Sequence, residues 1–134
     1  MPVPHYHVVA AIIRHEGNIL CVQKGVSKYA YISHRYEFPG GKVEPGESPQ
    51  SAMHREVQEE ICLDIRIDEW YYTVTHEYPD FRITMEAYLC SAMRIQSLLL
   101  TEHIDHQWLL ATKLTQLDWA AADWPIVIRL AGTS

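Results

Sequence analysis

The chain has 134 residues, of which 48% are hydrophobic and 21% are charged, and its formal net charge is −6. This length and composition predict one globular domain over residues 1–134, and no apolar stretch is long enough for a transmembrane helix. The negative charge argues against binding to DNA or RNA polymers, and the start of the chain lacks the pattern of a secretory signal. We therefore expect a cytoplasmic protein that contacts neither nucleic acid polymers nor membranes.

The first half of the chain predicts a β-hairpin, a loop and a helix. Residues 7–13 (HVVAAII) and 18–22 (NILCV) are rich in β-branched residues and are separated by turn-forming residues, so they predict a hairpin. Residues 25–36 show no clear period and predict a loop. Ser48 is a favourable helix cap and Pro49 suits the first helical turn, so a helix is expected from there to about residue 61.

The second half of the chain predicts mainly strands and ends in a helix. Aromatic and β-branched residues are frequent in residues 64–67, 70–78, 82–92 and 107–110, which predict strands. A short helical piece is expected over residues 114–119, and a closing helix over residues 124–130. This order of elements favours a mixed sheet packed between helices.

The first predicted helix ends in a group of glutamates. Glu56, Glu59 and Glu60 occupy positions i, i+3 and i+4, so their carboxylates converge on one patch beside the apolar stripe of the helix. Acidic side chains repel one another there and are also disfavoured by the helix dipole. A solvated acidic face is the alternative interpretation, but a position beside the core favours a site for a hard divalent cation, Mg²⁺ or Mn²⁺.

The loop before this helix is rich in glycine. Gly40 and Gly41 would allow the backbone to approach a ligand more closely than a side chain permits. Arg55 could bind Glu47 or a loop carbonyl and so hold the loop against the helix. A simple turn and a surface arginine are the alternative interpretations of these residues.

The stretch from Gly41 to Leu63 resembles the Nudix box of the Nudix hydrolases. Its spacing is a glycine, five residues, a glutamate, seven residues, Arg-Glu, an aliphatic residue, one residue and Glu-Glu, and Cys62 stands where the box has glycine. The resemblance covers most of the chain and is to the MutT-like branch. It implies an α/β/α sandwich with a mixed β-sheet between helices, and Mg²⁺-dependent cleavage of a nucleoside triphosphate to the monophosphate and pyrophosphate.

The resemblance also implies a set of metal ligands. Glu56, Glu59 and Glu60 would bind the metal together with the carbonyl of Gly40. Glu102, which lies in a loop outside the box, would reach the same metal. Glu56, Glu59 and Glu102 would be the catalytic residues, with either Glu56 or Glu102 as the general base.

Other residues of the box would support this set. Gly41, Glu47 and Arg55 would hold the loop and the helix together in the form that the metal requires. Lys42, directly after the glycines, would lie near the phosphates of the substrate.

Recognition of the base must come from outside the box. Asp123 lies where CTP-cleaving members of the family also have aspartate, and an ionised carboxylate would accept hydrogen bonds from an amino group such as that of cytosine. A cap for the closing helix is the alternative role. Tyr78 and Phe81 could stack on a base, although core packing is the alternative, and Gln23 or Lys24 could also contact the substrate.

Several functions remain open at this level. CTP, dCTP or a modified pyrimidine nucleotide is the first expectation, and 8-oxo-dGTP is the second. Hydrolysis of another nucleoside diphosphate derivative such as ADP-ribose is a third possibility, and nucleotide binding without turnover is a fourth. The protein is expected to be a monomer or a homodimer whose partner is a small nucleotide.

Overall fold

The computed structural model describes residues 3–132 of the chain. Within this range, none of the helices is long and apolar enough to cross a membrane. The elements are β1 (His5–His15), β2 (Asn18–Lys24), β3 (Tyr36–Glu37), β4 (Gly40–Lys42), α1 (Pro49–Ile61), β5 (Ile65–Glu77), β6 (Arg82–Ala92), η1 (Ile95–Ser97), β7 (His103–Leu109), η2 (Ala111–Gln116) and α2 (Trp124–Gly132), where η marks a 3₁₀-helix.

The strands form one mixed sheet. Its main path runs β3-β2-β1-β6-β5, while β4 pairs with β1 and β7 pairs with β2. The central strands β1 and β6 are parallel, and the other pairs described in residues 3–132 are antiparallel. β4 lies against the middle of β1, where Val9 is opposite Gly41 and Ala10 is opposite Gly40. The glycine-rich loop is therefore fixed to the centre of the sheet.

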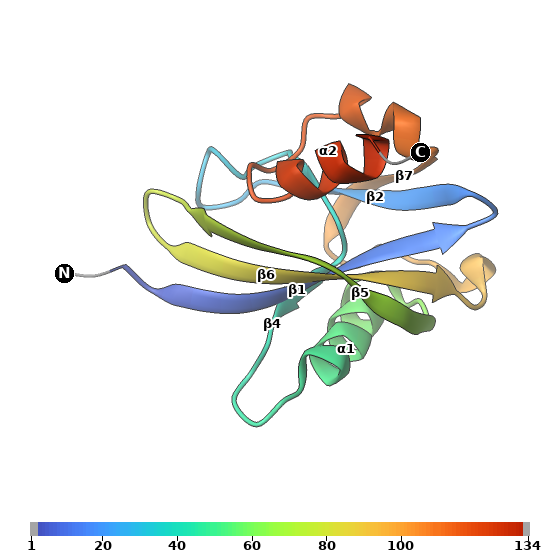
Figure 1. The fold of residues 1–134 in the computed structure, drawn as a ribbon, viewed down its shortest axis with the longest axis horizontal. Coiled ribbons are helices and arrows are strands. Elements are labelled where there is room, and N and C mark those ends of the chain that lie inside the picture. The colour runs from blue at the N-terminus through green and yellow to red at the C-terminus, as the bar shows by residue number, and fades with distance from the viewer. Residues whose placement is uncertain (1–2, 133–134) are drawn as a thin grey trace.

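The residues of β1 show why both faces of the sheet are covered. Val9, Ala11 and Ile13 pack into a cluster with α1, whereas Ala10 and Ile12 pack into a second cluster with α2. Figure 1 shows α1 and α2 on opposite sides of the sheet. Because successive side chains of a strand point to opposite faces, burial on both faces explains the continuous apolar run in the sequence. The α/β/α sandwich expected from the resemblance is confirmed.

Local signals place both ends of α1. The hydroxyl of Ser48 accepts a hydrogen bond from the backbone N–H of Ser51 at 3.1 Å, which caps the first turn. Cys62 follows the last turn with φ of 54°, and its N–H donates to the carbonyl of Gln58 at 3.1 Å. This left-handed conformation is the one that glycine adopts most easily, which explains the glycine of the Nudix box at this position.

Two expectations about strands are wrong in detail. Residues 64–67 and 70–78 do not form two strands, because β5 continues through them, with register shifts between Ile67 and Glu69 and between Trp70 and Tyr72. β5 lies at the edge of the sheet and exposes several side chains, so polar residues do not end it. β7 begins at His103 rather than at residue 107 and is thus longer than the sequence predicted.

Candidate active site

Most of the candidate residues line one cavity of about 470 Å³. α1, β4, the β5–β6 hairpin and the segment before α2 all contribute to its wall. Its lining includes Gly40, Gly41, Lys42, Glu56, Glu60, Tyr78, Phe81 and Asp123. The fold therefore brings the acidic helix together with the residues that were expected to recognise a base.

Arg55 joins the glycine-rich loop to α1. Its guanidinium donates to both carboxylate oxygens of Glu47, at 2.7 Å and 2.9 Å, and to the carbonyl of Lys42 at 3.1 Å. The Arg55 guanidinium, together with the backbone N–H of Glu44, holds the pKa of Glu47 down at about 2. Arg55 is thus a bridge between loop and helix rather than a free surface arginine.

Glu60 is the most buried carboxylate of the helix, with 7% of its surface exposed. One oxygen accepts the backbone N–H of Gly40 at 3.1 Å. Burial, with the nearby charge of Glu37, raises the pKa of Glu60 to about 9. A side chain at position 40 is impossible, because its Cβ would lie 1.9 Å from the carbonyl oxygen of Val9. Close contact between β4 and β1 therefore requires glycine at this position.

Glu56 faces the second glycine of the loop. A Cβ at Gly41 would lie 2.5 Å from the carboxyl carbon of Glu56, so the glycine leaves room for this carboxylate. One oxygen of Glu56 accepts from Arg55 at 2.9 Å. Burial raises the pKa of Glu56 above its ordinary value, and the guanidinium of Arg55 opposes this shift.

Glu59 and Glu102 are more exposed than the other predicted ligands. The side chain of Glu59 is 58% exposed and approaches Arg55 at 3.4 Å, so the expectation that it borders the core is wrong. Glu102 is also exposed, yet its charge contributes to the raised pKa values of Glu56 and Glu60. In residues 3–132, no three acidic, histidine or cysteine side chains are already gathered around one point. Binding of a metal by the full predicted set would require Glu56 and Glu59 to turn from Arg55.

The chemistry of this group nevertheless fits a divalent cation. Its donors are carboxylate and carbonyl oxygens, which suit Mg²⁺ and Mn²⁺ better than softer metals. The raised pKa values of Glu56 and Glu60 reflect negative charge that burial and neighbouring carboxylates disfavour. A cation at this place would remove that penalty.

Asp123 lies buried at another part of the cavity wall. One of its oxygens accepts the backbone N–H of Phe38 at 3.1 Å. Burial, with the charge of Glu37, raises the pKa of Asp123 well above its ordinary value. Burial therefore favours the protonated carboxyl of Asp123, which can donate as well as accept, over the ionised, purely accepting form expected from the sequence.

Tyr78 and Phe81 belong to an aromatic group beside Asp123. Their ring centroids are 5.0 Å apart, and Tyr78 also stacks on Tyr31 at 5.4 Å with an angle of 15° between the rings. The hydroxyl of Tyr78 accepts the backbone N–H of Ala122 at 3.0 Å. This group forms an apolar wall of the cavity, so packing and base stacking are compatible roles for it.

The remaining polar candidates are Lys42 and either Gln23 or Lys24, and they differ in position. The amine of Lys42 lies over the ring of Tyr6, 3.9 Å from its centroid, at the cavity wall. The amide of Gln23 donates to the carbonyl of His34 at 3.1 Å, and Lys24 rather than Gln23 lines the cavity. Lys24 is therefore the better placed of the two residues considered for substrate contact.

Glu37 and His103 were missed by sequence reasoning. Glu37 lines the cavity and influences the pKa values of both Glu60 and Asp123. His103 is buried and its Nε2 donates to the carboxylate of Glu37 at 2.9 Å. The available signal was a charged residue directly before Phe38 and the glycine-rich loop, but the two-residue strand β3 is too short to predict.

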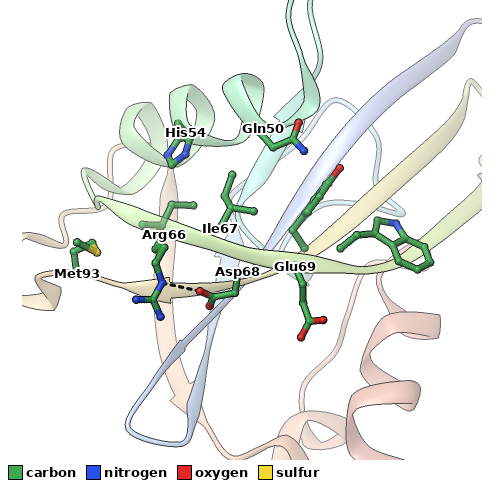
Figure 2. Close-up of a pocket in the computed structure, with 10 residues that line it drawn as sticks. Gln50, His54, Arg66, Ile67, Asp68, Glu69 and Met93 are labelled. Atoms are coloured by element: carbon green, nitrogen blue, oxygen red, sulfur yellow. Dashed lines mark hydrogen bonds and ion pairs between the residues drawn. The ribbon is translucent and has the colours of Figure 1, made fainter.

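A larger hollow of about 730 Å³ lies elsewhere, between α1 and β5. Figure 2 shows that Gln50 and His54 border it from α1, while Arg66 and Asp68 come from β5. Asp68 accepts hydrogen bonds from Arg14, Arg66 and the hydroxyl of Ser91. Asp68 is therefore already neutralised, and Glu69, the other carboxylate of this hollow, is exposed to solvent, so the hollow lacks the buried carboxyl groups that mark the smaller cavity.

The chain is similar in sequence and in fold to known proteins. Residues 3–130 match the family model described as NUDIX domain. The chain belongs to the Nudix family. This Nudix domain is 32% identical over 135 residues to the CTP pyrophosphohydrolase of Escherichia coli (strain K12), with 90% of the chain and 87% of the relative covered.

Two further proteins are similar over nearly their full length. The 8-oxo-dGTP diphosphatase of Escherichia coli (strain K12) is 28% identical over 123 residues, with 92% of this Nudix chain and 94% of that protein covered. The crystal structure of the MutT protein from Methanosarcina mazei Go1 aligns with a TM-score of 0.85 at 23% identity, covering 99% of the chain and 97% of that structure. The likeness to the Methanosarcina mazei structure concerns the fold alone.

The raised pKa of Glu60 predicts a pH-dependent stability that Glu60→Gln removes. Without divalent cations, Glu60 in the unfolded chain loses its proton near its ordinary pKa of 4.5, whereas the folded protein retains it up to about 9. As pH rises through this window, the free energy of unfolding of the wild type should fall relative to the variant by up to about 1.4 kcal/mol per pH unit. Denaturant unfolding at several pH values within the window measures the difference.

The exposed Glu59 supplies a control for this measurement. Glu59→Gln removes the same charge from the same helix at a position that is open to solvent. Its pH dependence should therefore follow that of the wild type. Parallel curves for the wild type and Glu60→Gln would contradict the assignment of a raised pKa to Glu60.

Proposed function

We propose that this chain is a divalent-cation-dependent pyrophosphohydrolase that cleaves a nucleoside triphosphate to the monophosphate and pyrophosphate. The cation is proposed to be Mg²⁺, with Mn²⁺ as a substitute, and the place of action the cytoplasm. The observation that carries the proposal is a single cavity lined by Glu56 and Glu60 and also by Asp123 and Tyr78. Such a cavity offers a cation-binding end for phosphates together with an aromatic, hydrogen-bonding end for a base.

The residues proposed to hold the cation are Glu56, Glu59, Glu60, Glu102 and the Gly40 carbonyl. When bound, the cation would neutralise charge along the phosphate chain and make water at the site more acidic. The protein contributes a fixed loop, because Arg55 ties it to α1 through Glu47 and the carbonyl of Lys42. Lys42 and Lys24 add positive charge at the cavity wall, where they can attract an anionic substrate.

Glu56 and Glu102 are the proposed candidates for the general base. Arg55 donates to Glu56 at 2.9 Å and favours its ionised form, which a base needs before it can take a proton. Glu102 is exposed and could approach from outside the cavity. Both candidates therefore remain within the proposal.

A cytidine-type triphosphate is the proposed substrate. In the protonated form that burial favours, Asp123 presents a donor beside an acceptor, which matches the ring nitrogen and the amino group on one edge of cytosine. The rings of Tyr78 and Phe81 lie beside this aspartate at the cavity wall and can cover the face of a base. The relative named CTP pyrophosphohydrolase supports this choice.

An oxidised guanine nucleotide is the second candidate. A guanine edge also places a donor beside an acceptor, so a protonated Asp123 can pair with it. The relative named 8-oxo-dGTP diphosphatase supports this alternative. The two substrates differ in size, and the pocket formed by Tyr78 and Phe81 would discriminate between them.

A panel of nucleotides with Mg²⁺ tests the proposed reaction. The wild type should release pyrophosphate from CTP, dCTP or 5-methyl-dCTP faster than from 8-oxo-dGTP or ADP-ribose. Glu56→Gln should lower the rate at least about a hundredfold, because it removes both a cation ligand and a candidate base. Chromatography of the products identifies the bond that is cleaved.

Glu69→Gln is the matched control for this panel. Glu69 lies on β5 at the larger hollow and is exposed, so the same chemical change there should leave the rate unchanged. Equal rates for Glu56→Gln and the wild type would refute the proposed reaction. Tight nucleotide binding without any turnover would favour a binding domain instead.

The protonated form proposed for Asp123 leads to a second prediction about catalysis. Asp123→Asn keeps a donor beside an acceptor, so kcat/KM for the preferred nucleotide should remain within about tenfold of the wild type. Asp123→Leu removes both groups and should lower kcat/KM at least about a hundredfold, because the buried edge of the base loses its partners. Steady-state kinetics measures kcat/KM for both variants. An equal loss of kcat/KM in Asp123→Asn and Asp123→Leu would exclude a role for the protonated form.

A further inference from the structure

His103 is the first residue of β7 and is buried beside the cavity. Its side chain is only 3% exposed, and its Nε2 lies 2.9 Å from a carboxylate oxygen of Glu37. Its other ring nitrogen, Nδ1, is buried and has no hydrogen-bond partner in residues 3–132. Because a carboxylate can only accept, Nε2 must carry the proton in this contact. The contact with Glu37 is thus the polar interaction that fixes the orientation of the ring.

A β-bulge directs His103 toward Glu37. β7 pairs with β2 so that Asp105 is opposite Gln23 and His103 is opposite Lys24, which leaves Ile104 as an extra residue. In a regular strand, residues 103 and 105 would point to the same face. A bulge changes this alternation and can re-aim a side chain next to an active site.

The contacts on β3 show the effect of this bulge. The hydroxyl of Tyr36 donates to Asp105 at 2.9 Å, while His103 donates to Glu37, the next residue of β3. Neighbouring residues of a strand point to opposite faces, so the side chains of Tyr36 and Glu37 lie on opposite faces of the sheet. Their partners Asp105 and His103 therefore also lie on opposite faces. The irregularity is what allows a residue of β7 to reach Glu37.

Glu37 lines the same cavity as Glu60 and Asp123. Its charge contributes, after burial, to the raised pKa of each of these two residues, so it lies within electrostatic reach of both. If phosphates bind near Glu60 and a base near Asp123, the sugar of the nucleotide would lie beside Glu37. A carboxylate held there can accept a hydrogen bond from a sugar hydroxyl.

We propose that His103 is a positioning residue that fixes the Glu37 carboxylate for contact with the substrate. The kinetic consequence rests on the proposed function, because it requires a nucleotide in the cavity. A positioning role acts through Glu37 alone and should appear mainly in KM. If His103 had a purely structural role, its substitution would instead lower the stability of the fold, and the effect would be the same whether or not Glu37 is present.

The test compares three variants of the full chain. His103→Leu removes the donor and should raise KM for the preferred nucleotide about tenfold while kcat changes less than about threefold. His103→Gln can place an amide N–H near the position of Nε2 and should restore KM to within about threefold of the wild type. Glu37→Ala should raise KM at least as much as His103→Leu.

The double variant decides whether His103 acts through Glu37. Adding His103→Leu to Glu37→Ala should change KM less than about twofold, because the group that His103 positions is already absent. An equal effect of His103→Leu with and without Glu37 would overturn the proposal. Thermal unfolding of each variant identifies any loss of fold.

A spectroscopic measurement on the wild type separates this proposal from the proposed function. Long-range ¹H–¹⁵N correlation of the imidazole should show a proton on Nε2 of His103, and this signal should shift in Glu37→Ala. An Nε2 without a proton would overturn the positioning role whatever the enzyme hydrolyses. A wild type that shows the Nε2 proton but no turnover would refute the proposed function and leave the contact established.

Discussion

The hydrogen bond from the Gly40 amide to the buried Glu60 carboxylate connects the two segments on which the site depends. It joins β4, which lies on the central strand β1, to the inner side of α1 over a distance of 3.1 Å. The same glycine permits an approach to Val9 that no other residue allows. These two contacts fix the glycine-rich loop relative to both the sheet and α1. The position of the acidic side chains at one end of the cavity results from this arrangement.

This geometry concentrates negative charge that the fold only partly balances. Arg55 neutralises Glu47 and approaches Glu56, whereas Glu60 has no arginine or lysine partner in residues 3–132. His103 contacts Glu37 nearby, and burial of Glu60 together with the charge of Glu37 disfavours the ionised form of Glu60. An arrangement of this kind is typical of a site whose charge is completed by a cation and an anionic substrate.

Much of the fold and part of the site could be predicted from sequence because local patterns determine them. Ser48 and Pro49 fixed the start of α1, and the helical period placed Glu60 next to the core, where the structure has it. The apolar run of β1 indicated burial on both faces. The Nudix box added the relation between loop and helix, which no local pattern contains.

Other features depend on distant pairing and could not be seen in this way. Glu37 and His103 are 66 residues apart and meet because β3 and β7 both pair with β2. The raised pKa of Asp123 depends on burial and on the charge of Glu37, neither of which its sequence neighbours reveal. The continuity of β5 depends on its pairing with β6, which overrides the polar residues within it.

Direct binding of Mn²⁺ to the nucleotide-free protein tests the central claim that the buried carboxylates form a cation site. Electron paramagnetic resonance measures free Mn²⁺ during titration of the wild type, of a Glu56→Gln/Glu60→Gln double variant and of Glu69→Gln. The account predicts that the double variant binds at least about tenfold more weakly, because two carboxyl ligands that can ionise on binding the cation are replaced by neutral amides, while Glu69→Gln matches the wild type. Equal affinity of the double variant and the wild type would contradict it.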